Sequence, residues 1–359
     1  MSTDPPGLRT TALATWMGSN VHGFDASGAP DAELLAGGRS NLTYAVTDAS
    51  GRRWAVRRPP LGHIMPSAHD LGREFTVLSR LSDVGYPVPR PWALCSDESV
   101  IGSRFLVMDF VDGIVIADQE DAEALTPDQC RHISRQLVDQ LARLHALDVE
   151  GTGLADFGRP QGYLARQVRR WGQQWELSRT RDVPGIALMA AWLADEVSRL
   201  PDDLPGSVVH GDYRLDNVIL STDATSLLAV LDWEMATLGD PVADLATFLI
   251  YWTQAGDRLR SLVPVAQGVT SGPGFWRREE LVDHYASVTG SSLDHLGFCL
   301  VLACYKLAVI LESLNYRSLM GQQLGRMSER GEDMGAAVNA LALLGQQLVH
   351  DPAVETIAG

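Results

Sequence analysis

Two short polar segments near the middle of the chain carry the residue types that phosphoryl transfer needs. The first runs His210-Gly211-Asp212 and ends at Asn217, and the second carries Asp232, fifteen residues further on. Phosphoryl transfer needs a carboxylate beside the attacking hydroxyl, together with a carbonyl-bearing side chain and a second carboxylate that hold Mg²⁺ against the phosphates. Two strands joined by a turn would bring Asn217 and Asp232 close in space. We therefore predict that Asp212 is the catalytic base and that Asn217 and Asp232 are metal ligands.

These motifs resemble those of the aminoglycoside phosphotransferase and choline-kinase-like family, a branch of the protein-kinase-like fold. The pattern His-Gly-Asp-x-x-x-x-Asn at 210–217 corresponds to the His-Arg-Asp-x-x-x-x-Asn catalytic loop of protein kinases. Leu-Asp-Trp-Glu at 231–234 corresponds to their Asp-Phe-Gly segment, and the residues at 239–246 also resemble this family. Asp and Asn are common in turns because their side chains bond the local backbone, so the pattern Asp-x-x-x-x-Asn alone is weak evidence for the family. Several motifs in the same order favour the family over a coincidental polar turn.

The resemblance extends to the first hundred residues. Two adjacent glycines at 37–38 fit the hairpin that covers the nucleotide phosphates, because glycine lets backbone N–H groups approach phosphate oxygens. Trp54-Ala55-Val56-Arg57 corresponds to the kinase strand Val-Ala-Ile-Lys, with Arg57 in the place of the lysine. Arginine keeps the charge and can bind phosphate through two N–H groups. Strand alternation places Ala55 and Arg57 on the nucleotide side.

A helix after this strand would supply Glu74 as the ion-pair partner of Arg57, and the segment 107–113 corresponds to the hinge, whose backbone meets the adenine. In this interpretation Met108 is as compatible with a core position as with nucleotide contact. The resemblance thus implies ten cofactor-binding residues: Gly37, Gly38, Ser40, Asn41, Ala55, Arg57, Glu74, Met108, Asp109 and Phe110.

The implied activity is transfer of a phosphoryl group from ATP or GTP, with Mg²⁺, to a hydroxyl of a small molecule. An acidic C-terminal lobe would suit polycationic aminoglycosides, so an antibiotic kinase is one alternative. The run Val-Arg-Arg-Pro-Pro at 56–60 resembles kinase-like domains fused to some acyl-CoA dehydrogenases. That subgroup points instead to hydroxyl-bearing metabolites, including hydroxyacyl thioesters. A nucleotide-binding pseudokinase or regulatory module is the third alternative, because the usual lysine is missing.

The elements that must position these residues form an α+β, bilobal protein-kinase-like plan. Residues 1–110 read mainly as strands, at 33–36, 42–47, 52–57 and 104–110, with one helix at 68–81. A linker follows at 111–118. Residues 119–359 are mainly helical, beginning with Thr126-Pro127 as N-cap and first residue of a helix that runs to about Leu147.

Several polar residues near the catalytic segment are predicted to have structural roles. Asp240-Pro241 fits the N-cap and first position of a helix, and Asp244 is placed to orient the catalytic loop. His210 is interpreted as a residue that braces this loop, and His145 as a helix histidine with its hydrogen bonds satisfied.

Composition narrows the function classes further. The 359 residues carry a formal net charge of −16, which disfavours binding to nucleic acid or to an anionic membrane. Four cysteines show no metal-ligand spacing, and no secretory signal is visible, so a reduced, cytoplasmic protein is predicted. The apolar run from Leu296 to Leu311 is interrupted by Lys306, the single lysine, and is predicted to be a buried helix of the core. The sequence predicts no oligomeric state.

Overall fold

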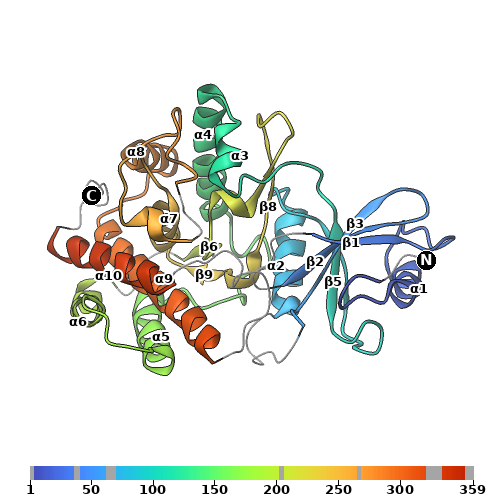
Figure 1. The fold of residues 1–359 in the computed structure, drawn as a ribbon. Helices are drawn as coiled ribbons and strands as arrows, with labels where there is room; N and C mark the ends of the chain where they lie inside the picture. The colour runs from blue at the N-terminus through green and yellow to red at the C-terminus, as the bar shows by residue number, and fades with distance from the viewer. Residues whose placement is uncertain are drawn as a thin grey trace. The chain divides into compact units, whose positions relative to one another are not determined.

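The computed structural model describes residues 4–35, 41–61, 70–201, 206–264, 268–320 and 334–351. Its internal contacts divide the chain into two compact units. The first comprises Met1–Asp112 with Leu228–Glu234, and the second comprises Gly113–Leu227 with Met235–Gly359. A strand-rich first unit and a helix-rich second unit give the α+β plan that the sequence predicts (Figure 1).

An antiparallel five-stranded sheet forms the centre of the first unit, in the order β1-β2-β3-β5-β4. Its strands are β1 (Asp31–Leu34), β2 (Leu42–Thr47), β3 (Arg53–Arg58), β4 (Pro91–Cys95) and β5 (Phe105–Asp109). The turn between β2 and β3 is organised by Asp48, which accepts hydrogen bonds from the backbone N–H groups of Ser50 and Arg52. Strands β2, β3 and β5 lie where the sequence predicts them, within one residue at each end.

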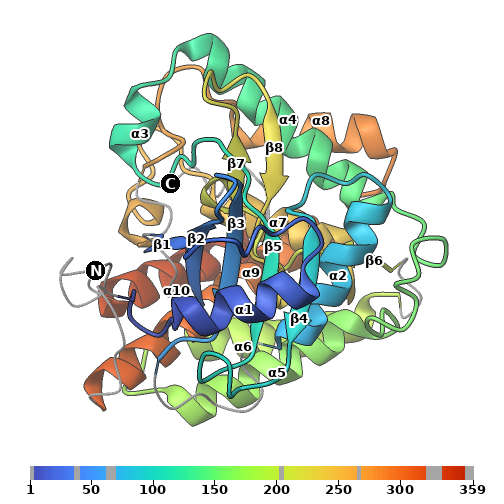
Figure 2. The same cartoon turned by 90° about the vertical axis from the view of Figure 1, so that its right-hand side faces the viewer.

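One face of this sheet packs against α1 (Thr10–Asn20), which crosses it in Figure 2. Trp54 and Val56 of β3 join Leu13 and Met17 of α1 in the apolar core. Arg58, on the same side of β3, is also buried, and its guanidinium donates to the Gly7 carbonyl. The alternation that buries Trp54 and Val56 leaves Ala55 and Arg57 on the opposite face, as expected.

The helix α2 (Leu71–Asp83) begins at Asp70, whose side chain accepts from the N–H groups of Gly72 and Arg73. Leu71, Leu78 and Leu81 are buried, in agreement with their helical spacing. Glu74 is buried on the same helix. A buried carboxylate needs a partner of opposite charge, so we expect Glu74 to pair with a cationic side chain of β3.

Helices dominate the second unit: α3 (Gln119–Glu123), α4 (Pro127–His145), α5 (Tyr163–Ser178), α6 (Ile186–Glu196), α7 (Pro241–Tyr251), α8 (Arg278–Thr289), α9 (Leu296–Leu319) and α10 (Met334–His350). The predicted cap of α4 is confirmed as a capping box, in which Thr126 and Gln129 bond each other's backbone N–H. The predicted cap of α7 is confirmed too, because Asp240 accepts from Val242 and Ala243 N–H.

The helix α9 is the one described helix long and apolar enough to cross a membrane. Most of its apolar window, 78%, is buried inside the protein. Its neighbours are α5, α6, α7 and α10 (Figure 1). This packing confirms the prediction of a core helix.

Short strands frame the catalytic segment. In the second unit, β6 (Ser207–Val209) pairs with β9 (Thr237–Gly239), and β7 (Val218–Leu220) follows Asn217. Backbone bonds join Ile114 to Leu220. A side chain at Gly113 would lie 2.3 Å from the Leu220 carbonyl oxygen, so this contact requires glycine. The strand β8 (Leu227–Val230) leads toward Asp232.

Candidate active site

Arg57 is the centre of an ion-pair cluster in the first unit. Its Nη1 lies 3.1 Å from Glu74 Oε1, and its Nη2 lies 2.5 Å from Asp232 Oδ1. The Arg57 side chain is 12% exposed, Glu74 3% and Asp232 25%. The predicted Arg57–Glu74 pair is therefore present, and the same guanidinium also holds the carboxylate predicted to bind metal.

Burial alone would lower the pKa of Arg57, because it penalises the charged form. The charges of Glu74 and Asp232 outweigh this penalty and raise the pKa of Arg57 well above its ordinary value. Arginine at this position is thus a permanent cation between two carboxylates.

Asn41 and the backbone of Asp232 complete this cluster. The Asn41 amide, with its oxygen toward the guanidinium, accepts from Arg57 Nε and Nη2 at 3.1 and 3.0 Å. Asp232 has a φ of +64°, in the left-handed region that few residues other than glycine adopt. Such strain is typical of functional turns and fixes the direction of the Asp232 side chain.

The predicted hinge residues lie at the end of β5, beside β3. Met108 is buried, and Ala55 pairs with it across the sheet. The Asp109 carboxylate accepts from Trp92 Nε1 at 2.7 Å, and its N–H donates to the Arg90 carbonyl. The Phe110 ring lies 3.6 Å from the Arg53 guanidinium carbon. The contact of this segment with a nucleotide base stays a prediction.

The predicted phosphate-covering residues Gly37, Gly38 and Ser40 lie outside the residues that the structure describes. Their roles stay predictions.

Asp212 is the centre of a second cluster, in the second unit. Tyr251 Oη donates to Asp212 Oδ1 at 2.8 Å. On the other oxygen, Oδ2, Arg214 Nε donates at 3.2 Å and Asn217 Nδ2 at 3.1 Å. Arg214 also pairs with Asp216. Three donors therefore fix the orientation of the carboxylate that the sequence predicts to be the base.

These contacts shift the pKa values of the two donor side chains. Burial raises the pKa of Tyr251 well above its ordinary value, and the Asp212 charge raises it further, so Tyr251 stays a protonated donor. Burial would lower the pKa of Arg214, but the charges of Asp212 and Asp216 outweigh it and raise the value. Asn217 donates through Nδ2 to both the carbonyl and the carboxylate of Asp212. Its Oδ1 is then the atom that can meet a cation.

The backbone before Asp212 is held by Asp244 of α7. The N–H groups of His210 and Gly211 donate to its two carboxylate oxygens, at 2.7 and 2.8 Å. His145 Nε2 lies 3.3 Å from the same carboxylate, while its Nδ1 meets the Tyr285 hydroxyl at 2.7 Å. These bonds confirm the bracing role predicted for Asp244 and the satisfied state predicted for His145.

Gly211 is required at its position. Its φ is +82°, and a side chain there would lie 2.8 Å from the Met235 carbonyl oxygen. Lys306 of α9 donates to the Gly211 carbonyl. Burial lowers the pKa of Lys306, although the charges of Asp212 and Asp244 act against this shift. The single lysine of the chain therefore stabilises the catalytic loop through the backbone of Gly211.

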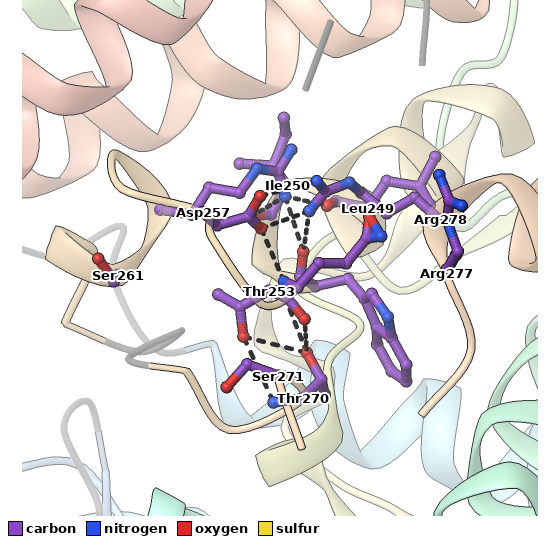
Figure 3. Close-up of polar contacts among 12 residues, drawn as sticks. Leu249, Ile250, Thr253, Asp257, Ser261, Thr270, Ser271, Arg277 and Arg278 are labelled. Carbon is purple, nitrogen blue, oxygen red and sulfur yellow. Dashed lines mark hydrogen bonds and ion pairs between the residues drawn. The ribbon is translucent and has the colours of Figure 1, made fainter. Parts of the chain in front are cut away.

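Two buried arginines hold the C-terminal end of α7, which carries Tyr251. Arg260 Nη1 donates to the Leu249, Ile250 and Trp252 carbonyls, and Arg278 Nη1 also donates to Trp252. Arg278 pairs with Asp257 through two contacts of 2.6 and 2.9 Å (Figure 3). The last carbonyls of a helix lack partners within it, and positive charge is favourable there. Both ends of α7 are thus anchored, one at Asp244 and the other beside Tyr251.

A small cleft opens beside the Asp212 cluster, within the second unit. Its walls come from the segment after Gly113, the catalytic loop and the end of α7, and include Ile116, Arg214, Asp216, Tyr251, Trp252 and Thr270. Its enclosed volume is about 20 Å³, enough for roughly one water molecule. An acceptor placed here would need the cleft to widen.

The structure thus groups the described site residues into two sets. Asn41, Arg57, Glu74 and Asp232 meet in the first unit, and Asp212 and Asn217 meet in the second. Sequence reasoning missed Tyr251 as a partner of Asp212. A signal was present, because Tyr251 follows Asp244 by seven residues on one helix, which places both on one face.

Comparison with known proteins decides the family. The sequence model of the phosphotransferase enzyme family matches residues 31–278. The chain belongs to this family. It is also 34% identical to acyl-CoA dehydrogenase family member 11 of Gallus gallus, over 90% of this chain and 41% of that protein. The human protein of the same name is 33% identical over 94% of this chain and 42% of its own length. The chain thus spans about two fifths of these relatives.

Solved structures give the same family and fold. A Ralstonia eutropha structure, described provisionally as an aminoglycoside phosphotransferase, is 30% identical with a TM-score of 0.78, covering 95% of this chain and 98% of that one. The GDP complex of aminoglycoside 2'-phosphotransferase-IIIa is 16% identical with a TM-score of 0.61, covering 94% and 99% of the two chains. This family member has the protein-kinase-like fold, as predicted.

Proposed function

We propose that this family member is a cytoplasmic, Mg²⁺-dependent kinase that transfers a phosphoryl group from ATP or GTP to a hydroxyl of a small molecule. The observation that carries the proposal is the Asp212 carboxylate, held by Tyr251, Arg214 and Asn217 on the loop that Asp244 braces. A fixed carboxylate can accept the proton of a substrate hydroxyl or orient that hydroxyl for attack.

The side chains of the two predicted metal ligands carry oxygen donors of the kind that Mg²⁺ binds. Mg²⁺ prefers oxygen ligands and usually keeps several waters while binding one or two protein groups. Asn217 would offer its amide oxygen, and Asp232 would offer its carboxylate, which Arg57 already contacts through Oδ1. When bound, the ion would neutralise charge that develops on the transferring phosphoryl group. Arg57, oriented by Glu74 and Asn41, would bind the α- and β-phosphates in place of the usual lysine.

The acceptor class is a separate choice within this proposal. The relatives named acyl-CoA dehydrogenases contain a region similar to this chain, which supports hydroxyacyl thioesters and related hydroxyl-bearing metabolites as the first acceptors to screen. An aminoglycoside acceptor is the second candidate, supported by the similarity to the Ralstonia structure. A resistance assay separates the two: an unchanged inhibitory concentration for every aminoglycoside in a sensitive host favours the metabolite.

Thermal stabilisation by ATP and by GTP, each with and without Mg²⁺, tests the nucleotide site. A ligand at 100 times its dissociation constant adds about 2.7 kcal/mol to the free energy of unfolding. We expect a Mg²⁺-dependent shift in the wild type that Asp232→Asn loses. The matched variant Asp212→Asn should keep this shift and lose most turnover, because the base does not bind the nucleotide.

No shift with either nucleotide would contradict both the kinase and a nucleotide-binding pseudokinase, and would favour a regulatory module. Wild-type turnover in Asp212→Asn would contradict the base assignment alone.

A further inference from the structure

A second group of side chains that could bind a metal ion lies in the second unit. None of its members has a role in the proposed phosphoryl transfer. Within the described part of the chain, it is the group of three in which carboxylate, imidazole and thiol atoms converge: Asp240, His295 and Cys299. One ligand atom from each lies within 4.8 Å of the other two. Asp240 and Cys299 are buried at 3% and 1% exposure, and the His295 side chain is 13% exposed.

The backbone preorganises these three side chains. The sequence predicts no metal-ligand spacing for the cysteines, but His295 and Cys299 are four residues apart at the start of α9. This spacing places both side chains on one face of that helix. Asp240 uses Oδ1 to cap α7, which directs its other oxygen, Oδ2, toward His295 Nε2 at 2.9 Å. The cap therefore holds Asp240 in the orientation that brings Oδ2 to the other two ligands.

The distances suit a tetrahedral metal centre. With bond lengths of about 2.0 Å to nitrogen and oxygen and about 2.3 Å to sulfur, ligand atoms lie roughly 3.3–3.5 Å apart. The Asp240–His295 separation is already close to this value. A movement of the Cys299 thiol on the order of 1 Å would complete the set, and side-chain rotation can supply it.

The surrounding charge favours a cation. Tyr163 and Tyr285 show raised pKa values from burial, followed by the charges of Asp244 and Asp240. The carboxylates of Asp240 and Asp244, at the start of α7, are the negative charges that act on both tyrosines.

We propose that Asp240, His295 and Cys299 bind one divalent cation of the zinc class, with water as the fourth ligand. Thiolate is a soft ligand and imidazole a borderline one, and both suit Zn²⁺ and Co²⁺ better than Mg²⁺, which prefers oxygen. Binding releases the proton of the Cys299 thiol, and His295 would bind through Nε2 as a neutral imidazole that carries its proton on Nδ1. The carboxylate and thiolate charges then balance the charge of the ion.

Such an ion would join the start of α7 to the start of α9. The first helix carries Asp244 and Tyr251, and the second carries Lys306, which are the residues that hold the catalytic loop. The ion would therefore stabilise the support of the active site without entering the reaction.

The test is a Co²⁺ titration of the full chain after chelation and gel filtration, in a non-thiol reductant. We expect one equivalent of Co²⁺ to give the thiolate charge-transfer band and the intense visible bands of a tetrahedral site, and Zn²⁺ to abolish both. Co²⁺ bound to the oxygen ligands Asn217 and Asp232 would give neither signal, so the readout is independent of the nucleotide site.

Cysteine variants identify the ligand. Cys299→Ala should lose the charge-transfer band, whereas Cys304→Ala, at another buried cysteine of the same helix, should keep it. His295→Ala, at the most exposed ligand, should weaken Co²⁺ binding at least tenfold, and it keeps the test valid if Cys299→Ala does not fold.

Absence of the band at one equivalent overturns the proposal. Retention of the band in Cys299→Ala, or Co²⁺ affinity unchanged in His295→Ala, overturns it as well.

Discussion

Replacement of Arg57 by methionine should destabilise the protein strongly, because this one guanidinium contacts two carboxylates. Its contacts with Glu74 and Asp232 are 3.1 and 2.5 Å long, and no member of the trio is more than a quarter exposed. Loss of the cation leaves the Glu74 carboxylate buried beside a second negative charge. Removal of one partner from a buried ion pair costs about 3–5 kcal/mol. We expect Arg57→Met to lower the free energy of unfolding by about that amount.

Two further variants grade the effect. Glu74→Gln leaves Arg57 paired with Asp232, so it should cost only about 1.5–3 kcal/mol, the value of one charged hydrogen bond. Arg57→Lys keeps the charge but cannot contact both carboxylates through a planar fork. Its loss in free energy of unfolding should lie between those of Arg57→Met and Glu74→Gln.

Arg53→Met is the matched control on the same strand. Arg53 pairs with Asp112, but their side chains are 37% and 75% exposed, so solvent screens this pair. Exposed pairs contribute roughly 0–1 kcal/mol. Urea unfolding followed by tryptophan fluorescence, without nucleotide, measures all four variants. A cost for Arg57→Met no larger than that for Arg53→Met would refute the reasoning.

Three other perturbations follow from the second unit. Tyr251→Phe removes one hydrogen bond from Asp212, worth about 1.5–3 kcal/mol, so kcat should fall by roughly 10–100-fold with the nucleotide-dependent thermal shift unchanged; equal kcat would contradict this role. Burial would raise the pKa of Asp244, but hydrogen bonds and the His145 charge outweigh burial and lower it. The Asp244 carboxylate therefore stabilises the fold fully above pH 3.8, its ordinary pKa, and this stabilisation is lost as the pH falls through the lower pKa of the folded state. The thermal difference between wild type and Asp244→Asn should therefore be largest at neutral pH and shrink below pH 3.8, and a constant difference would count against it. Thr126→Ala should cost about 1 kcal/mol, measured by urea unfolding, because α4 loses its capping box.

Local sequence signals predicted much of this molecule. The strand β3 follows from residue alternation and β5 from a short apolar run, and the starts of α4 and α7 follow from their capping residues. Each of these features depends on neighbours within a few positions, where residue type constrains the backbone directly.

Features that depend on distant contacts were not predicted. The helix α1 and the strand β4 carry weak local patterns, and they are stabilised by packing on the sheet. Lys306 was predicted only as an interruption of an apolar helix, yet it contacts the Gly211 carbonyl, 95 residues earlier. The left-handed backbone of Asp232 likewise has no signature in the residue type.

The single lysine also makes the chain its own reporter of unfolding. A protease that cleaves only after lysine has one target bond in the 359 residues, between Lys306 and Leu307. That bond lies in the middle of α9, among residues buried in the core. Cleavage requires an extended segment, so the enzyme can cut only when α9 opens. When opening and closing are fast relative to cutting, the cleavage rate measures the population of that open state. Two fragments of known size would then report the stability of the helix that supports the catalytic loop, without a label or an engineered site.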